Sequence, residues 1–383
     1  MKELILLYWG AVFLMYLSQV YYPVSVRLDG HHAGKYSFMR RKTDIFMVIV
    51  IAWMTCFSFL RTSYNDTYQY IILFREAVSV EEGIATGIFA NLTGNPGSLL
   101  YRSLIHDFTN NYHIYFFFPA IMSSFSVIKL FKRYSVNSAL SVLIFFSLGT
   151  YILYIAALKQ CMAMFFLLMA LPFAVEKKYV RFYLLVIVAI LFHTHAFMFA
   201  IVPFLLEKPW SKRTWILLVL VLSSIATYDV TLGAFMNFAQ SIGAMVAEGE
   251  VFDGHSINVL RVLVYWVPAI LALIFRKRLF EDSTPIENLF VNMSLVSAFI
   301  LMIGLREGAN LYARMAAYFE IATPIALPWM IHKLFEKRSA QYVTCIAAIL
   351  YFSYFYYEFA FTKNFGTSYS SITLLEFFMS LFK

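Results

Sequence analysis

Long apolar runs recur along the chain and set the first limit on what it can fold into. Runs of roughly 16 to 24 apolar residues follow one another from Leu4 to Phe361 with short charged linkers between them, and about 20 such residues cross a hydrocarbon core as a helix. The chain is 61% hydrophobic and 14% charged, whereas a soluble domain needs a larger polar surface. We therefore expect an all-α fold: a polytopic transmembrane helical bundle in which residues 1–383 form a single integral membrane domain.

The apolar runs divide into about twelve predicted spans. Two of these, 181–194 and 195–206, belong to one run, "RFYLLVIVAILFHTHAFMFAIVPFLL", that His193 and His195 interrupt. This run is either one tilted span or two short, broken spans that meet at the histidines. The other expected boundaries are 4–26, 44–60, 111–128, 137–156, 160–175, 214–232, 257–275, 285–304, 311–331 and 341–360.

The basic linkers favour two short spans. Basic linkers of membrane proteins stay in the cytoplasm, and if "EKKYVR" and "EKPWSKR" are both cytoplasmic, the run between them must cross the membrane and return. His193 and His195 then lie at an outer turn, and both termini lie outside. The linkers that carry 20 of the 30 Lys and Arg residues are "RLDGHHAGKYSFMRRKT", "KLFKRYS", "EKKYVR", "EKPWSKR", "RKRLFED" and "HKLFEKRS".

Two longer linkers are then extracytoplasmic. In residues 61–110 the stretches "EEGIATGIFANL" and "GSLLYRSLIHDF" repeat apolar residues every three or four positions, which predicts amphipathic helices on the outer face. Residues 233–256 form the second extracytoplasmic loop and contain no Lys or Arg. Because the outer side is elaborated and the cytoplasmic side is thin, we expect any site for chemistry to face outward.

The distribution of charge and cysteine limits the classes of ligand. The formal net charge is +8, but the basic residues lie in small groups between apolar runs, so nucleic acid is not expected as a partner. Cys56, Cys161 and Cys345 all lie inside apolar runs, and we expect neither a disulfide nor a metal site from them. The sequence requires no metal and no other cofactor.

Four cations lie at the predicted outer boundary of the spans: Arg61, Lys159, Arg306 and Arg314. A charge inside a span costs about 2.5–3.5 kcal/mol at the helix centre, and few acids are present there to pair with these cations. The excess of positive charge suggests a multiply charged anion at the headgroup layer, such as a lipid diphosphate. Asp66 is then the outward carboxylate best placed to act as a base.

Plainer interpretations of the same residues stay open. Asp66 can cap a helix that starts at Thr67, as Asp commonly does. Arg61 and Lys159 can extend along apolar surface to the interface without binding any ligand.

The histidines and the last arginine also allow more than one role. His193 and His195 are two residues apart, which on a regular helix turns them about 200° from each other. A shared metal is therefore a weak hypothesis, and a hydrogen-bonding role or a role as general acid or base is favoured. Glu320 can partly neutralise Arg314.

Taken in order, these short motifs resemble the EpsG family of polysaccharide polymerases, a Wzy-like branch grouped with the C-type membrane glycosyltransferases (GT-C). The similarity extends over residues 40 to 335. Tyr64 and Asn65 stand where the family usually has Gly and Thr, and Lys159 stands where it usually has Arg, which keeps the charge but gives up bidentate phosphate binding. The matching motifs are "RTSYNDTYQY" with Arg61, Asp66, Thr67 and Tyr70, "LKQCMAMFF" with Lys159 and Gln160, "ILFHTHAF" with His193, and "LYARMAAYF" with Arg314 and Tyr318.

The resemblance implies glycosyl transfer on the outer face of the bacterial cytoplasmic membrane, for capsule, O-antigen or exopolysaccharide biosynthesis. A glycan on undecaprenyl diphosphate would be moved to a lipid-linked acceptor repeat unit, with a flippase and a chain-length regulator as further partners beside the lipid bilayer. Asp66 would deprotonate the acceptor, and His193 would orient the acceptor or replace Asp66 as base. The residues implied as ligands of the substrate and its diphosphate are Arg61, Lys159, Gln160, Arg306, Arg314 and Tyr318.

Two other classes of function also explain parts of the pattern. A flippase for lipid-linked sugars would use cations for a diphosphate, but it should distribute polar residues through the membrane depth and show an internal repeat. A membrane acyltransferase that modifies an extracytoplasmic glycan would depend on a buried histidine, here His193. That class gives no reason for the excess of cations.

Overall fold

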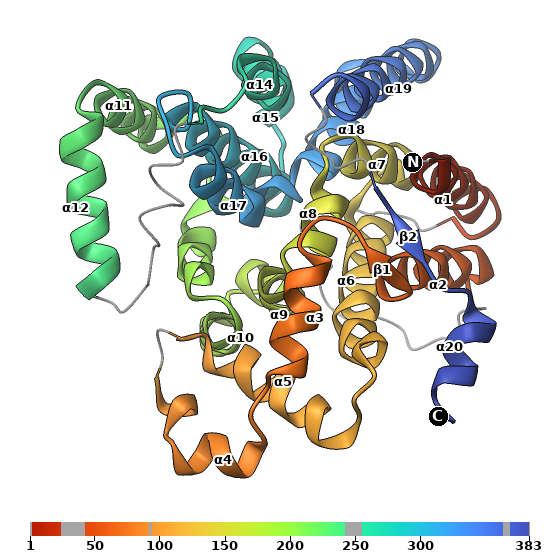
Figure 1. The fold of residues 1–383 in the computed structure, drawn as a ribbon. Coiled ribbons are helices and arrows are strands. Elements are labelled where there is room, and N and C mark those ends of the chain that lie inside the picture. Colours follow the sequence, from red (N-terminus) through yellow and green to blue (C-terminus); the bar gives the residue numbers. More distant parts are fainter. Residues whose placement is uncertain (1, 24–42, 92–93, 242–254, 363–367, 383) are drawn as a thin grey trace.

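The computed structural model describes residues 2–23, 43–91, 94–241, 255–362 and 368–382 (Figure 1). Most of them are helical and very few are in strands, so the all-α expectation is confirmed. The helices are α1 (Lys2–Tyr21), α2 (Ile45–Phe59), α3 (Thr67–Arg75), α4 (Val80–Ala85), η1 (Ile88–Ala90), α5 (Pro96–Phe108), α6 (Tyr112–Tyr134), α7 (Ser138–Ser147), α8 (Thr150–Ala156), α9 (Leu158–Val175), α10 (Tyr179–Phe192), η3 (Thr194–Leu206), α11 (Lys212–Ala226), α12 (Tyr228–Ser241), α14 (Val259–Ile274), α15 (Arg276–Phe280), α16 (Pro285–Ile303), α17 (Ala309–Glu320), α18 (Thr323–Leu334), α19 (Lys337–Ala360) and α20 (Leu374–Ser380). The strands are β1 (Arg61–Ser63) and β2 (Ser370–Ser371).

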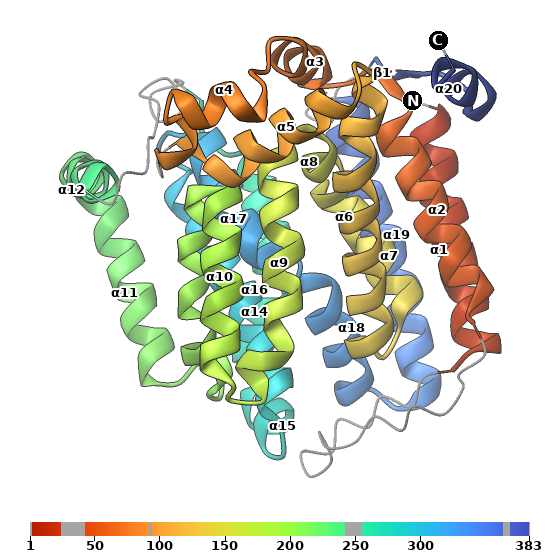
Figure 2. The same ribbon diagram turned by 90° about the horizontal axis from the view of Figure 1, so that it is seen from below.

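Most of the long helices run along one common direction, and α3, α4 and α5 lie across one end of this bundle (Figure 2). We call that end the roofed end. α1 begins there and α20 lies there, whereas the basic helix α15 lies at the opposite end. In the interior every residue of α7 is buried, while α11 buries only Thr214. The outermost helices thus present apolar side chains to their surroundings, as helices in lipid do.

Within the described parts of the chain, five helices are long and apolar enough to cross a membrane: α1, α6, α9, α16 and α19. Two bent pairs raise the number to seven if each pair counts as one span, namely α7 with α8, bent by 59°, and α11 with α12, bent by 102°. Shorter apolar helices are α2, α10, η3 and α14. Each predicted span corresponds to a helix or to a pair of helices within the described ranges, and the count of twelve stays a prediction.

The predicted boundaries differ from the structure where a helix breaks inside an apolar run. The expected span 137–156 is divided at Gly149, whose φ of 75° ends α7 because a left-handed residue cannot continue a helix. The expected span 311–331 is α17 followed by α18, with a break after Glu320. The expected span 214–232 ends as α11 at Ala226, and the loop expected from residue 233 begins inside α12, with 242–254 outside the described residues.

The run that carries the histidines folds into two antiparallel segments. α10 ends at Phe192, His193 has the extended backbone angles φ −152° and ψ 113°, and η3 then starts at Thr194. The Phe182 ring stacks on Phe199 at 6.3 Å between centroids, so the chain returns beside itself. The division predicted at the histidines is therefore present.

A segment near the C-terminus, residues 369–380, packs against the chain just after α2, and we call this segment the C-terminal strap. β2 pairs antiparallel with β1, and Tyr369 stacks on Phe57 with 4.2 Å between the ring centroids. The Tyr369 hydroxyl donates to the Phe57 carbonyl at 2.8 Å, and Phe377 of α20 packs edge-on against Phe59. These contacts fix the chain at the point where it leaves α2 for the roof.

Candidate active site

A cavity of about 430 Å³ lies at the roofed end, between the roof and the ends of bundle helices. Cavities of this size hold ligands of a few hundred daltons. α3 and the start of α5 contribute from the roof, and the starts of α9 and η3, together with α17, contribute from the bundle. The lining residues are Asp66, Gln69, Tyr70, Leu73, Gly94, Asn95, Ala157, Lys159, Gln160, His193, Thr194, His195, Leu311, Arg314 and Met315.

Breaks between helices bring the polar side chains to this cavity. Ala157 has φ −105° and ψ 73°, which separates α8 from α9 and places Lys159 and Gln160 in the first turn of α9. His193 separates α10 from η3 in the same way. A break lets neighbouring residues point in directions that one continuous helix forbids, and this is why His193 and His195 can both line the cavity, with ring centroids 5.1 Å apart.

Asp66 is the carboxylate of the cavity. It occupies the N-cap position of α3, but its side chain makes no capping hydrogen bond to that helix. The residue before it, Asn65, has a φ of 46°, a left-handed conformation that Asn tolerates better than most residues. Asp66 itself is exposed and lines the cavity. Its oxygens are therefore available to a ligand, although the position is that of a helix cap.

Lys159 and Arg314 bring positive charge to the cavity from α9 and α17. The Gln160 amide links the two helices, because its Nε2 donates to the backbone carbonyl of Arg314 at 2.7 Å. The Gln160 side chain is 1% exposed, and its Oε1 has no hydrogen-bond partner among the described residues. A buried acceptor without a donor costs about 1–3 kcal/mol.

Arg61 lies beneath the cavity and is fully buried. Its guanidinium donates to the Ser58 carbonyl, to the Thr67 hydroxyl at 2.8 Å and to the Ile155 carbonyl at 3.2 Å, and it lies 4.2 Å from the centre of the Phe116 ring. Burial lowers the pKa of Arg61 to about 10, so it stays charged at neutral pH. It joins the start of the roof to the end of α8 and does not line the cavity.

His193 and Tyr318 share a hydrogen bond, with 2.5 Å between Nδ1 of His193 and the phenol oxygen of Tyr318. Tyr318 is fully buried and stands behind the histidine rather than in the cavity lining. Burial, His195 and the cations Arg314 and Lys159 lower the pKa of His193 to about 3. The imidazole in this turn is thus neutral near pH 7, but its low pKa makes it a weak base, which favours an orienting role.

The remaining predicted residues divide between the cavity and its surroundings. Tyr70 lines the cavity, and its hydroxyl accepts a hydrogen bond from the backbone N–H of Leu158 at 3.1 Å. Arg306 is exposed between α16 and α17, outside the residues that line the cavity. The structure therefore brings together Asp66, Lys159, Gln160, His193 and Arg314 and leaves Arg61, Tyr318 and Arg306 outside the cavity lining.

Gln69 and Asn95 line the cavity and were not singled out in the sequence. Asn95 has a φ of 58° at the start of α5, and its Oδ1 accepts hydrogen bonds from the Thr194 backbone N–H at 2.9 Å and hydroxyl at 3.1 Å. The string "GNPG" carried the signal, because Asn before Pro commonly opens a helix. No group of three His, Cys, Asp or Glu residues that could hold a metal occurs in the described parts of the chain.

The fold and the cavity define a helical, multi-pass membrane protein in which cations and the carboxylate of Asp66 line a cavity at one end of the bundle. The family model of the EpsG family matches residues 44–372, so the chain belongs to the EpsG family, a family of Wzy-like polysaccharide polymerases. The membership that the motifs predicted is confirmed. No curated protein and no solved structure matches the chain.

Proposed function

We propose that the protein polymerises polysaccharide repeat units on the outer face of the bacterial cytoplasmic membrane. It transfers a glycan from undecaprenyl diphosphate to the sugar of a lipid-linked acceptor repeat unit. The observation that carries the proposal is the cavity in which Asp66, with no capping bond, shares one space with Lys159 and Arg314. A flippase that supplies the repeat unit and a regulator of chain length are the partners that such an enzyme would need.

In this reaction the acceptor hydroxyl oxygen attacks the anomeric carbon of the donor glycan. The bond between that carbon and the diphosphate oxygen breaks, the bonding electrons leave with the diphosphate, and the hydroxyl proton passes to Asp66. Lys159 and Arg314 stabilise the negative charge that develops on the leaving group. Gln160 Oε1 accepts a hydrogen bond from the bound sugar, and His193 orients the acceptor. Arg61 and Tyr318 act as positioning residues.

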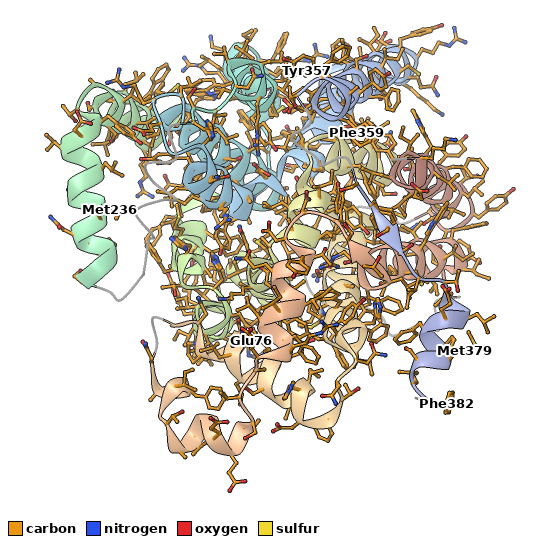
Figure 3. The ribbon with its side chains drawn as sticks, in the orientation of Figure 1. Glu76, Met236, Tyr357, Phe359, Met379 and Phe382 are labelled. Carbon is orange, nitrogen blue, oxygen red and sulfur yellow. The ribbon has the colours of Figure 1, made fainter. Side chains whose placement is uncertain are left out.

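The role of Asp66 is tested in a strain that lacks the gene and carries a plasmid-borne copy. Asp66→Asn keeps the size of the side chain and removes the base, so we expect surface glycan of single repeat units and a rate of polymerisation lower by about 10² to 10⁴. Glu76→Gln is the matched control, because Glu76 is exposed at the other end of α3 (Figure 3). Long glycan chains in the Asp66→Asn strain would exclude the base assignment.

The cation assignment makes a second prediction. Arg314→Ala removes a charge from the cavity, so polymerisation should fall by about 10² or more, whereas Arg306→Ala should retain most of it because Arg306 lies outside the lining. Both variants are compared by the length distribution of the glycan at equal protein levels. An equal loss in the two variants would mean that Arg306 also binds the diphosphate. Lipid-linked repeat units that accumulate on the cytoplasmic face would instead favour a flippase.

A further inference from the structure

The helix η3 connects the polar cavity with a second, apolar one. Its first residues, Thr194 and His195, line the cavity at the roofed end, while Ile201, Phe204 and Leu205 near its other end line a crevice of about 360 Å³. α11 and α16 form the other walls of this crevice. One continuous element thus leads from the charged cavity into the apolar part of the bundle.

The helical form of η3 aligns its side chains into a stripe. η3 is a 3-10 helix of 13 residues, and side chains three residues apart lie directly above one another in such a helix. His195, Met198, Ile201 and Phe204 therefore share one face. The stripe begins with a residue of the polar cavity and ends with two residues of the crevice. With a rise of about 2.0 Å per residue, Phe204 lies about 18 Å from His195.

The crevice is open to the side of the molecule. α11 packs against α16, and α12 turns away from the bundle at the roofed end (Figures 1 and 2). Ile201 is 40% exposed and Phe204 is 64% exposed. Opposite them, Ile216 and Leu217 of α11 line the crevice. An apolar chain in the membrane can enter between α11 and η3 without leaving the hydrocarbon.

We propose that this stripe and α11 form the track for the isoprenoid chain of the lipid diphosphate whose charged head binds at Lys159 and Arg314. The inference rests on the proposed function and adds where the lipid lies. Charge complementarity selects the occupant, because an amphipathic ligand with an anionic head at one end of η3 necessarily directs its apolar chain along the membrane. Most of the crevice is lined by Ile, Leu, Val and Phe side chains, which suit a branched isoprenoid, and its charged lining residues, Glu207 and Arg213, lie beyond the end of η3.

A larger apolar groove of about 590 Å³ lies between α14, α18 and α19. None of these helices contributes to the lining of the charged cavity. η3 contributes residues both to the charged cavity and to the crevice, whereas no helix of the larger groove reaches the lining of the charged cavity. This comparison favours the crevice as the site of the chain.

The track is tested by blocking it in the purified protein, held in lipid nanodiscs. Ile201→Trp fills the crevice from η3, and Leu217→Trp fills it from α11. Ile187→Trp is the matched control, because Ile187 is 54% exposed on α10 and lines neither cavity. The probes are radiolabelled undecaprenyl diphosphate and radiolabelled geranyl diphosphate. Geranyl diphosphate has the same charged head, but its chain of two isoprene units ends before it reaches Ile201. Unfolding temperatures confirm that each variant is folded.

We expect both blocking variants to bind undecaprenyl diphosphate at least ten-fold more weakly than the wild type and to bind geranyl diphosphate within two-fold of it. The control should bind both as the wild type does. If both blocked variants bind undecaprenyl diphosphate as tightly as the wild type does, the proposed track is wrong and bulk lipid fills the crevice. Lys159→Ala separates the two proposals, because it should weaken both probes. If Lys159→Ala weakens the binding of neither probe, Lys159 does not bind the diphosphate and the site in the proposed function is wrong, whatever the blocked variants show.

Discussion

At the scale of single residues, Arg61 shows how a buried charge can build a site that it does not line. Its donors satisfy the Ser58 and Ile155 carbonyls, which come from segments far apart in the chain. Arg61→Met keeps much of the volume but leaves these acceptors without donors, so we expect a loss of about 2–4 kcal/mol in stability together with loss of activity. Arg314→Ala should lose activity at an almost unchanged unfolding temperature. Equal unfolding temperatures in the two variants would contradict the positioning role of Arg61.

His193 gives a prediction about pH at the same scale. Its folded pKa of about 3 lies below the ordinary value near 6.5, so the unfolded chain binds a proton there before the folded one does. The contribution of His193 to stability is complete above pH 6.5 and is lost as the pH falls toward 3. Between pH 7 and pH 5 the wild type should lose about 1–2 kcal/mol more than His193→Gln. Unfolding temperatures across this range measure the difference, and parallel curves would refute it.

At the scale of elements, the apolar runs predicted where helices lie but not how they break. Gly149 divides the expected span 137–156 at a position that a hydropathy pattern does not detect, whereas the break at His193 was predicted from the charges of the flanking linkers. That the segment after His193 forms the 3-10 helix η3 was not predicted. Asp66 was recognised as an N-cap from local sequence, but whether its carboxylate caps the helix depends on the strained turn at Asn65. The environment of Arg61 was beyond prediction, since its partner Ile155 is 94 residues away.

The C-terminal strap is an element whose role can be measured. Tyr369 stacks on Phe57 and donates to its carbonyl, and this contact holds the strand that leads to Asp66. Tyr369→Ala should lower stability by about 2–4 kcal/mol and reduce polymerisation, because the roof loses its anchor. Tyr356→Ala on α19 is the control, since Tyr356 is 50% exposed. Activity that survives a clear drop in unfolding temperature would show that the strap stabilises the fold without positioning the site.

At the scale of the whole molecule, the two ends of the bundle differ in chemistry. The roofed end carries the cavity, both strands and α20. Met379 of α20 and Phe382 just after it are exposed, as apolar side chains at a lipid interface are (Figure 3). The opposite end carries the basic helix α15. The positive-inside rule predicts that the basic end faces the cytoplasm. The cavity then opens on the side where lipid-linked repeat units are joined in the proposed reaction.

This orientation is tested with single cysteines. In a background without Cys56, Cys161 and Cys345, Glu81→Cys on α4 and Lys277→Cys on α15 place one exposed thiol at each end of the bundle. A thiol reagent that cannot cross the membrane should label Glu81→Cys in intact spheroplasts and Lys277→Cys only after lysis, because the basic helix stays in the cytoplasm. The reverse pattern would place the cavity inside, where the donor and acceptor of the proposed polymerisation are not displayed. The family membership would then be unaffected, but an outward-facing site would be excluded.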